Sequence, residues 1–168
     1  ERRFSGNQLA VFVNSPDLSD EQMLDIAREI HFSETTFVQP AGIGENRFSV
    51  RIFTPEHEVP FAGHPVLGTA FVLREEVMEL PSNEIILKLP VGKIPVTYIP
   101  EPGRSPVLWM KQNQPVFSGL FRQDEIAEVL SLPVSSLDPR FPVEEVSTGL
   151  PFIIVPIVSR EAVRAAKI

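Results

Sequence analysis

The alternation of apolar and polar positions predicts short strands interrupted by a few helices. Residues 9–13 form an apolar run that a turn-rich Asn-Ser-Pro-Asp stretch ends, which indicates a strand and a turn. Ser19 is suited to cap a helix, and the two acidic residues after it stand where the helix dipole favours negative charge. Beyond the cap, apolar residues recur at helical spacing, at Met23, Ile26, Ala27 and Ile30. This stretch therefore predicts an amphipathic helix of about three turns.

The middle of the chain predicts two strands and one apolar helix. Residues 31–38 indicate a strand, and residues 47–53 alternate polar and apolar side chains as a half-buried strand does. Pro65 fits the first position of a helix, where its missing N–H costs nothing. Residues 66–73 follow with hardly any polar face. Because a helix that is apolar all round must bury every side, we expect it to be surrounded by protein.

The second half of the chain predicts a change of domain. Residues 85–89, 94–99 and 107–111 are short apolar segments separated by turns, which favours an antiparallel meander around the apolar helix. We expect the first domain at residues 1–115 and the beginning of a second at residues 116–168, which is short for an independent domain of this kind. The chain is therefore expected to stop partway through the second domain. Its predicted elements are a helix at 121–130, a strand at 152–158 and a helix start at 160–167.

Charge and composition exclude several classes of function. The chain carries 15 basic and 22 acidic residues, a net charge of −7, and has no basic block, so nucleic acid and anionic membranes are poor partners. The chain has no cysteine, which excludes disulfides, thiolate nucleophiles and iron–sulfur ligation. The longest apolar run, residues 150–158, falls far short of the roughly 20 residues of a membrane-spanning helix. We expect a cytoplasmic protein.

Two residues are candidates for proton chemistry. His64 stands between Gly63 and Pro65 at the predicted helix start, where backbone N–H groups bind carboxylates and a histidine can hold a proton. The alternative is a helix-capping histidine packed into the loop. Glu34 lies near the start of a predicted strand between hydroxyl side chains and could act as a general base. The alternative is a glutamate at a strand edge that merely faces water, as most such glutamates do.

A metal site is not predicted. His57 and Glu58 begin a zinc-protease pattern, but Phe61 stands where the second histidine should be and Pro60 would break the required helix. His57 is therefore interpreted as a solvated turn residue.

Six stretches in the order and spacing of one family give the chain a resemblance to the phenazine-biosynthesis-like PhzF isomerases. The resemblance covers essentially the whole chain. It implies an α+β fold of the diaminopimelate epimerase type, in which a curved, mostly antiparallel sheet is rolled around a central helix. The stretches are Phe4-Ser-Gly-Asn7, Ile26-Ala-Arg-Glu29, Ser33-Glu-Thr-Thr-Phe37, Arg51-Ile-Phe-Thr-Pro55, Pro60-Phe-Ala-Gly-His-Pro65 with Leu67-Gly68, and Ser147-Thr-Gly-Leu-Pro-Phe152.

The resemblance also implies an activity and a site. Glu34 would be the proton-shuttling acid/base, Gly63 and His64 would lie at the substrate, and Asn7 and Ser33 would line the same pocket. The reaction would be a cofactor-independent isomerisation of a small carboxylate. Members of this family often form homodimers, so the resemblance also implies a possible homodimer. The alternative is a non-catalytic protein that kept the fold and binds a small carboxylate or another protein, since one scaffold hosts many functions.

Overall fold

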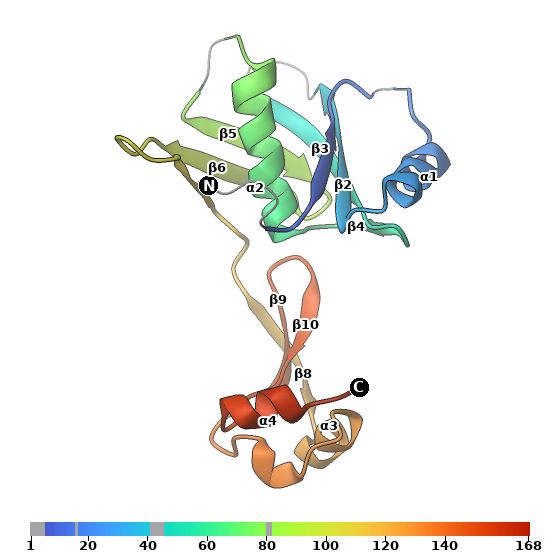
Figure 1. Ribbon diagram of the computed structural model, residues 1–168, viewed down its shortest axis with the longest axis vertical. Coiled ribbons are helices and arrows are strands. Elements are labelled where there is room, and N and C mark those ends of the chain that lie inside the picture. The colour runs from blue at the N-terminus through green and yellow to red at the C-terminus, as the bar shows by residue number, and fades with distance from the viewer. Residues whose placement is uncertain (1–5, 16, 41–45, 80–81) are drawn as a thin grey trace. The chain divides into compact units, whose positions relative to one another are not determined.

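The computed structural model describes residues 6–15, 17–40, 46–79 and 82–168. They form two compact units, Glu1–Asn113 and Gln114–Ile168 (Figure 1). Each unit is described by itself below. That the smaller unit begins a second epimerase-like domain stays a prediction.

The larger unit contains one mixed sheet. Its strands follow the order β1-β2-β3-β5-β6-β7, and the short β4 pairs with β3. The β1–β2 and β3–β5 pairs are parallel and the other pairs are antiparallel, so the sheet is mostly antiparallel, with the predicted meander at β5, β6 and β7. The bounds are β1 (Leu9–Phe12), β2 (Glu34–Pro40), β3 (Arg47–Phe53), β4 (Glu58–Val59), β5 (Glu84–Leu89), β6 (Gly92–Ile99) and β7 (Val107–Met110).

Helix α2 (Gly63–Val72) is the central helix that the sequence predicts. It contacts β1 and β7, the two end strands of the path, and also β2 and β5, because the sheet curls around it (Figure 1). Gly68 faces β1 so closely that a Cβ atom there would lie 2.6 Å from Cδ2 of Leu9. The core between helix and sheet includes Val66, Ala70 and Leu73 from the helix side, and Val50, Ile52, Leu87 and Ile94 from the strands.

Helix α1 (Asp20–Ile30) lies against β2 and β3, and its buried residues form a second cluster. Met23 and Ala27 pack with Phe37 and Phe53. The helix begins with a capping box, in which the Ser19 hydroxyl accepts from the Gln22 N–H and the Gln22 side chain accepts from the Ser19 N–H. The predicted amphipathic helix and its cap are therefore confirmed.

Two predicted boundaries in the larger unit are wrong. Strand β2 begins at Glu34 rather than at residue 31, because His31 ends α1 in the left-handed conformation with a φ of 57°. Helix α2 begins at Gly63, so that Pro65 occupies its third position. Proline is tolerated there because the first four N–H groups of a helix have no partner within it. The helix continues as one π-helical turn at Leu73–Val77.

The smaller unit consists of a three-stranded antiparallel sheet and short helices. The strand order is β10-β9-β8, and Ala127, Leu137 and Val143 form the core. Strands β8 and β9 were not predicted. The predicted helix at 121–130 begins only at Gln123, because Phe121 ends β8. The predicted strand at 152–158 ends at Ile154. The elements are β8 (Val116–Phe121), α3 (Gln123–Val129), the 3-10 turn Val134–Ser136, β9 (Val143–Ser147), β10 (Pro151–Ile154) and α4 (Arg160–Ala165).

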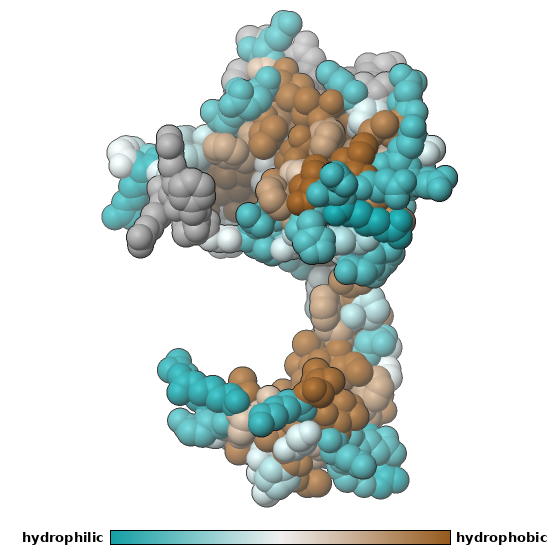
Figure 2. Space-filling model, turned by 45° about the vertical axis from the view of Figure 1, so that its right-hand side comes forward, coloured by the Kyte–Doolittle hydropathy of each residue, from teal (hydrophilic) through white to brown (hydrophobic). Residues whose placement is uncertain are grey.

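One face of this small sheet is apolar and exposed. Phe117 and Phe152 are both opposite Val146, while Leu120 and Ile154 are both opposite Glu144, so the register places all four on one face. All four side chains are exposed. Figure 2 shows hydrophobic atoms gathered on the surface of the smaller unit.

Candidate active site

Glu34 and His64 meet between β2 and α2. The Oε2 atom of Glu34 lies 3.3 Å from Nε2 of His64, and the two side chains are 19% and 37% exposed. Both atoms are themselves buried, and neither makes a well-aligned hydrogen bond within the described parts of the chain. A carboxylate and an imidazole at this distance can share or exchange a proton after a small rotation of either side chain.

Local structure accounts for the position of each group. Glu34 is the first residue of β2, and alternation along the strand puts it on the same face as Thr36, whose hydroxyl contacts α2. His64 is the second residue of α2. The N-cap of that helix is Ala62, without a side-chain cap, so His64 is not the capping histidine of the alternative interpretation. The positive end of the helix dipole therefore lies beside the pair.

Asn7 and Ser33 are a second pair of candidate residues. The Ser33 hydroxyl donates a hydrogen bond to Oδ1 of Asn7 at 2.6 Å, and both residues are exposed. Gly6 precedes Asn7 with a φ of 98°, a conformation that favours glycine. Since the Asn7 oxygen accepts from Ser33, the amide N–H2 of the same side chain is the group that can donate to an anion. The first two residues of the Phe4-Ser-Gly-Asn7 stretch lie outside the described residues.

The structure thus brings Glu34 together with His64, and Asn7 together with Ser33. Gly63 is the first residue of α2, and a Cβ atom there would lie 3.5 Å from Cε of Met110 in β7. The sequence did not indicate that Met110 lies beside Gly63, because that contact depends on how far the sheet curls around the helix.

The acidic loop before α2 is a structural turn. The Thr54 hydroxyl accepts from the N–H groups of Glu56 and His57, and His57 is exposed as predicted. Arg51 of β3 holds β4, the strand after this loop, because its guanidinium donates hydrogen bonds to both carboxylate oxygens of Glu58 at 2.8 and 2.6 Å. The hydrogen bonds from Arg51 to Glu58 raise the pKa of Arg51 above its usual range, so this clamp stays charged.

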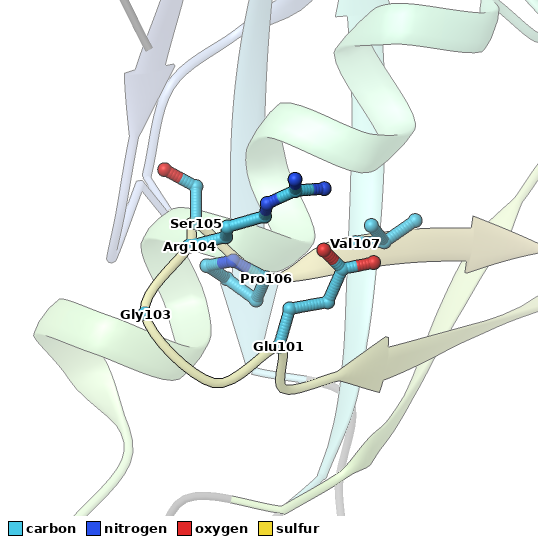
Figure 3. A pocket seen from close by; sticks show the side chains of 6 residues that line it. All are labelled: Glu101, Gly103, Arg104, Ser105, Pro106 and Val107. Carbon is cyan, nitrogen blue, oxygen red and sulfur yellow. The ribbon is translucent and has the colours of Figure 1, made fainter.

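Two hollows of the larger unit lie elsewhere. One, of about 710 Å³, is formed by the connection between β6 and β7, where Glu101 and Arg104 extend from the loop (Figure 3). The other, of about 520 Å³, lies between that connection and the Gly68 side of α2. Neither is lined by Glu34 or His64. Within the described residues, no group of three or more His, Cys, Asp or Glu side chains could hold a metal ion, and no helix could cross a membrane.

The family model for phenazine biosynthesis-like proteins (PhzC-PhzF) matches residues 1–168. The chain therefore belongs to this family. It is 37% identical over 161 residues to trans-2,3-dihydro-3-hydroxyanthranilate isomerase of Pseudomonas aeruginosa, a match that covers 95% of this chain and 55% of the isomerase. The chain thus spans about half the length of the curated relatives it matches.

Solved structures share the fold. A predicted epimerase from Pseudomonas aeruginosa superposes with a TM-score of 0.87 at 33% identity, over 99% of this chain and 59% of that one. A probable proline racemase from Agrobacterium radiobacter K84 has a TM-score of 0.56 at 13% identity, over 84% of this chain and 41% of that one. The α+β fold of the diaminopimelate epimerase type, with its curled sheet, is confirmed.

Proposed function

We propose that the protein is a cofactor-independent isomerase that moves a proton between two carbons of a small carboxylate. Glu34 is the acid/base, and His64 is its partner in holding the proton. The observation that carries the proposal is the distance of 3.3 Å between Oε2 of Glu34 and Nε2 of His64. Both atoms are buried, and neither has a hydrogen-bond partner within the described residues. A small carboxylate is the proposed partner, and a cytoplasmic homodimer is the proposed state of the whole protein.

The proposed reaction has two proton transfers and no net change in composition. The Glu34 carboxylate removes a proton from an sp3 carbon of the substrate, and the electron pair of the broken C–H bond shifts the neighbouring double bond. The protonated Glu34 then returns the proton to a different carbon. Glu34 begins and ends the cycle as a carboxylate, so neither oxidant nor reductant is required.

The remaining groups suit the negative charge of such a substrate. The N–H groups of Gly63 and His64 lie at the unpaired, positive end of α2. Donors of this kind stabilise both a bound carboxylate and the charge that develops as the proton leaves. The amide of Asn7, held by Ser33, is a second proposed donor to the substrate. The proposed substrate-binding residues are therefore Asn7, Ser33, Gly63 and His64, while Glu34 and His64 move the proton.

The test is exchange of substrate hydrogen with solvent deuterium. The full-length protein is incubated in D2O with trans-2,3-dihydro-3-hydroxyanthranilate, the compound in the name of the relative, and deuterium on carbon is followed by NMR and mass spectrometry. We expect exchange in the parent protein and a loss of at least about a hundredfold in Glu34→Gln, because a positioned acid/base typically contributes that much.

Glu84→Gln is the matched control, because Glu84 is also the first residue of a strand and is exposed. It should exchange at the parent rate. Undiminished exchange in Glu34→Gln would refute the proposed role of Glu34. Saturable binding of the compound by the parent protein without any exchange would favour the non-catalytic alternative.

A further inference from the structure

Behind the Glu34–His64 pair, two threonine hydroxyls join the same strand and helix. Oγ1 of Thr36 in β2 lies 2.8 Å from Oγ1 of Thr69 in α2, and both residues are fully buried. The Thr36 hydroxyl also reaches the carbonyl oxygen of Ala10 in β1, in a long hydrogen bond of 3.4 Å. With Thr36 donating to Ala10, the Thr69 hydroxyl donates to Thr36. In the part of the chain that the structure describes, this is the one side-chain hydrogen bond between β2 and α2.

The spacing of the two contacts matches along the strand and along the helix. Thr36 follows Glu34 by two residues, which is about 6.5 Å along a strand. Thr69 follows His64 by five residues, which is about 7.5 Å along a helix. Five residues also turn the helix by about 140°, so His64 and Thr69 leave α2 on different sides. The two contacts together therefore restrict both the slide and the rotation of α2 relative to β2.

The hydroxyls are also costly unless they are paired. A buried hydroxyl without a partner carries a desolvation penalty. Within the described residues the Thr69 side chain has only Thr36 as a hydrogen-bond partner, so Thr69 favours the arrangement in which Thr36 is within reach. Apolar contacts elsewhere along α2 depend on distance but do not require a particular bond direction. The hydroxyl pair therefore adds a directional contact between α2 and β2 to this packing.

We infer that Thr36 and Thr69 are positioning residues for the Glu34–His64 pair. Their hydrogen bond holds the start of α2 in register with the start of β2 and so keeps Nε2 of His64 close to Oε2 of Glu34. The inference rests on the proposed function only in its consequence for catalysis. The geometric part concerns the two side-chain pairs alone.

Strand β2 offers a matched control at the next residue. Thr35 is also fully buried, but it lies on the opposite face of the strand, and its hydroxyl has no hydrogen-bond partner within the described residues. Thr36→Val and Thr35→Val therefore make the same chemical change one residue apart. Thr36→Ser keeps the hydroxyl and loses only a methyl group.

The kinetic experiment compares these variants in the deuterium exchange assay of the full-length protein. Thr36→Val should lower kcat by between about tenfold and a hundredfold with a smaller change in KM, because misplacement of reacting groups by an ångström has effects of this size. Thr36→Ser should keep most of the parent rate, and Thr35→Val should match the parent. The double variant Thr36→Val/Thr69→Val should lose no more than the worse single variant, because the two residues act as one unit.

A second readout does not require activity. The protein has three histidines, so the ring signals of His64 in a 1H–15N NMR spectrum can be assigned by comparison with His64→Gln. Thr36→Val should move the His64 ring signals, whereas Thr35→Val should not. If the parent protein exchanges no deuterium but Thr36→Val still moves these signals, the proposed function is wrong and the positioning role stands. Equal His64 signals and equal exchange in Thr36→Val and Thr35→Val would overturn the positioning role.

Discussion

The absence of a side chain at Gly68 determines how closely β1 approaches the central helix. A Cβ atom there would lie 2.6 Å from Cδ2 of Leu9, which is the end of a side chain that can rotate away. In Gly68→Ala, the gain in helix propensity of up to about 1 kcal/mol offsets this displacement. We expect the free energy of unfolding, measured in urea, to change by less than about 1 kcal/mol.

Gly68→Val should behave differently, because its two further methyl groups overpack the same contact at a cost of about 1–3 kcal/mol. In a protein that already carries Leu9→Ala, Gly68→Val should lower the free energy of unfolding by less than it does in the parent protein. Equal stability of Gly68→Val and the parent protein would show that the contact between α2 and β1 is looser than the structure indicates.

The residues of the candidate site could be predicted singly but not as a pair. Glu34 and His64 were each candidates because of their immediate neighbours, yet their meeting depends on the curl that brings β2 against α2. Thr69 carried a signal that sequence reasoning passed over. It is a polar residue within an otherwise apolar helix, and a buried hydroxyl requires a partner. The identity of that partner, Thr36, required the structure.

At the scale of elements, local signals decided which predictions were right. Helix α1 has its start encoded in Ser19 and Gln22 and its buried face in a regular period, so it was predicted correctly. Strand β8 carries a bulge near Gly119 that interrupts its alternation, and its apolar residues Val116, Phe117 and Leu120 are all exposed, so no regular buried face marks it as a strand. Helix α1 ends at His31, which adopts a left-handed backbone conformation. The residue type of His31 does not predict that conformation, so the end of the helix was not predicted.

The capping box of α1 provides the prediction at this scale. Ser19→Ala removes the hydroxyl that accepts from the Gln22 N–H, and loss of such a cap costs about 1 kcal/mol. We expect the free energy of unfolding of the larger unit to fall by that amount, measured in urea through Trp109, the only tryptophan of the chain. Glu29→Ala, an exposed change on the same helix, should leave it nearly unchanged. Equal losses in both variants would contradict a specific role of the cap.

At the scale of the whole molecule, the candidate residues are unevenly divided between the two units. Every candidate residue, Asn7, Ser33, Glu34, Gly63 and His64, lies in the larger unit, and so does the hydroxyl pair. The smaller unit is held by a small core and by a polar contact at its edge. There the buried carboxylate of Asp138 accepts hydrogen bonds from the exposed Arg140, through its backbone N–H and its guanidinium. The stability of the smaller unit should therefore depend on pH through the Asp138 carboxylate.

The hydrogen bonds from the Arg140 side chain, and then from its backbone N–H, lower the pKa of Asp138 to about 2. An unfolded aspartate titrates near about 3.9. Because the folded pKa is the lower one, the ionised carboxylate stabilises the smaller unit fully above about pH 4, and this contribution disappears as the pH falls through about 2. The prediction is that Asp138→Asn is less stable than the parent protein at neutral pH and that the difference shrinks towards pH 2.

The measurement follows the two units separately. Amide signals of residues 114–168 in 1H–15N NMR spectra, recorded in urea between pH 7 and about 2, report the smaller unit. Trp109 and Tyr98, the only tryptophan and tyrosine, both lie in the larger unit and report it by fluorescence. Comparing the parent protein with Asp138→Asn removes the titration of all other carboxylates. A stability difference that stays constant from neutral pH to acid would show that Asp138 does not titrate differently in the folded and unfolded states.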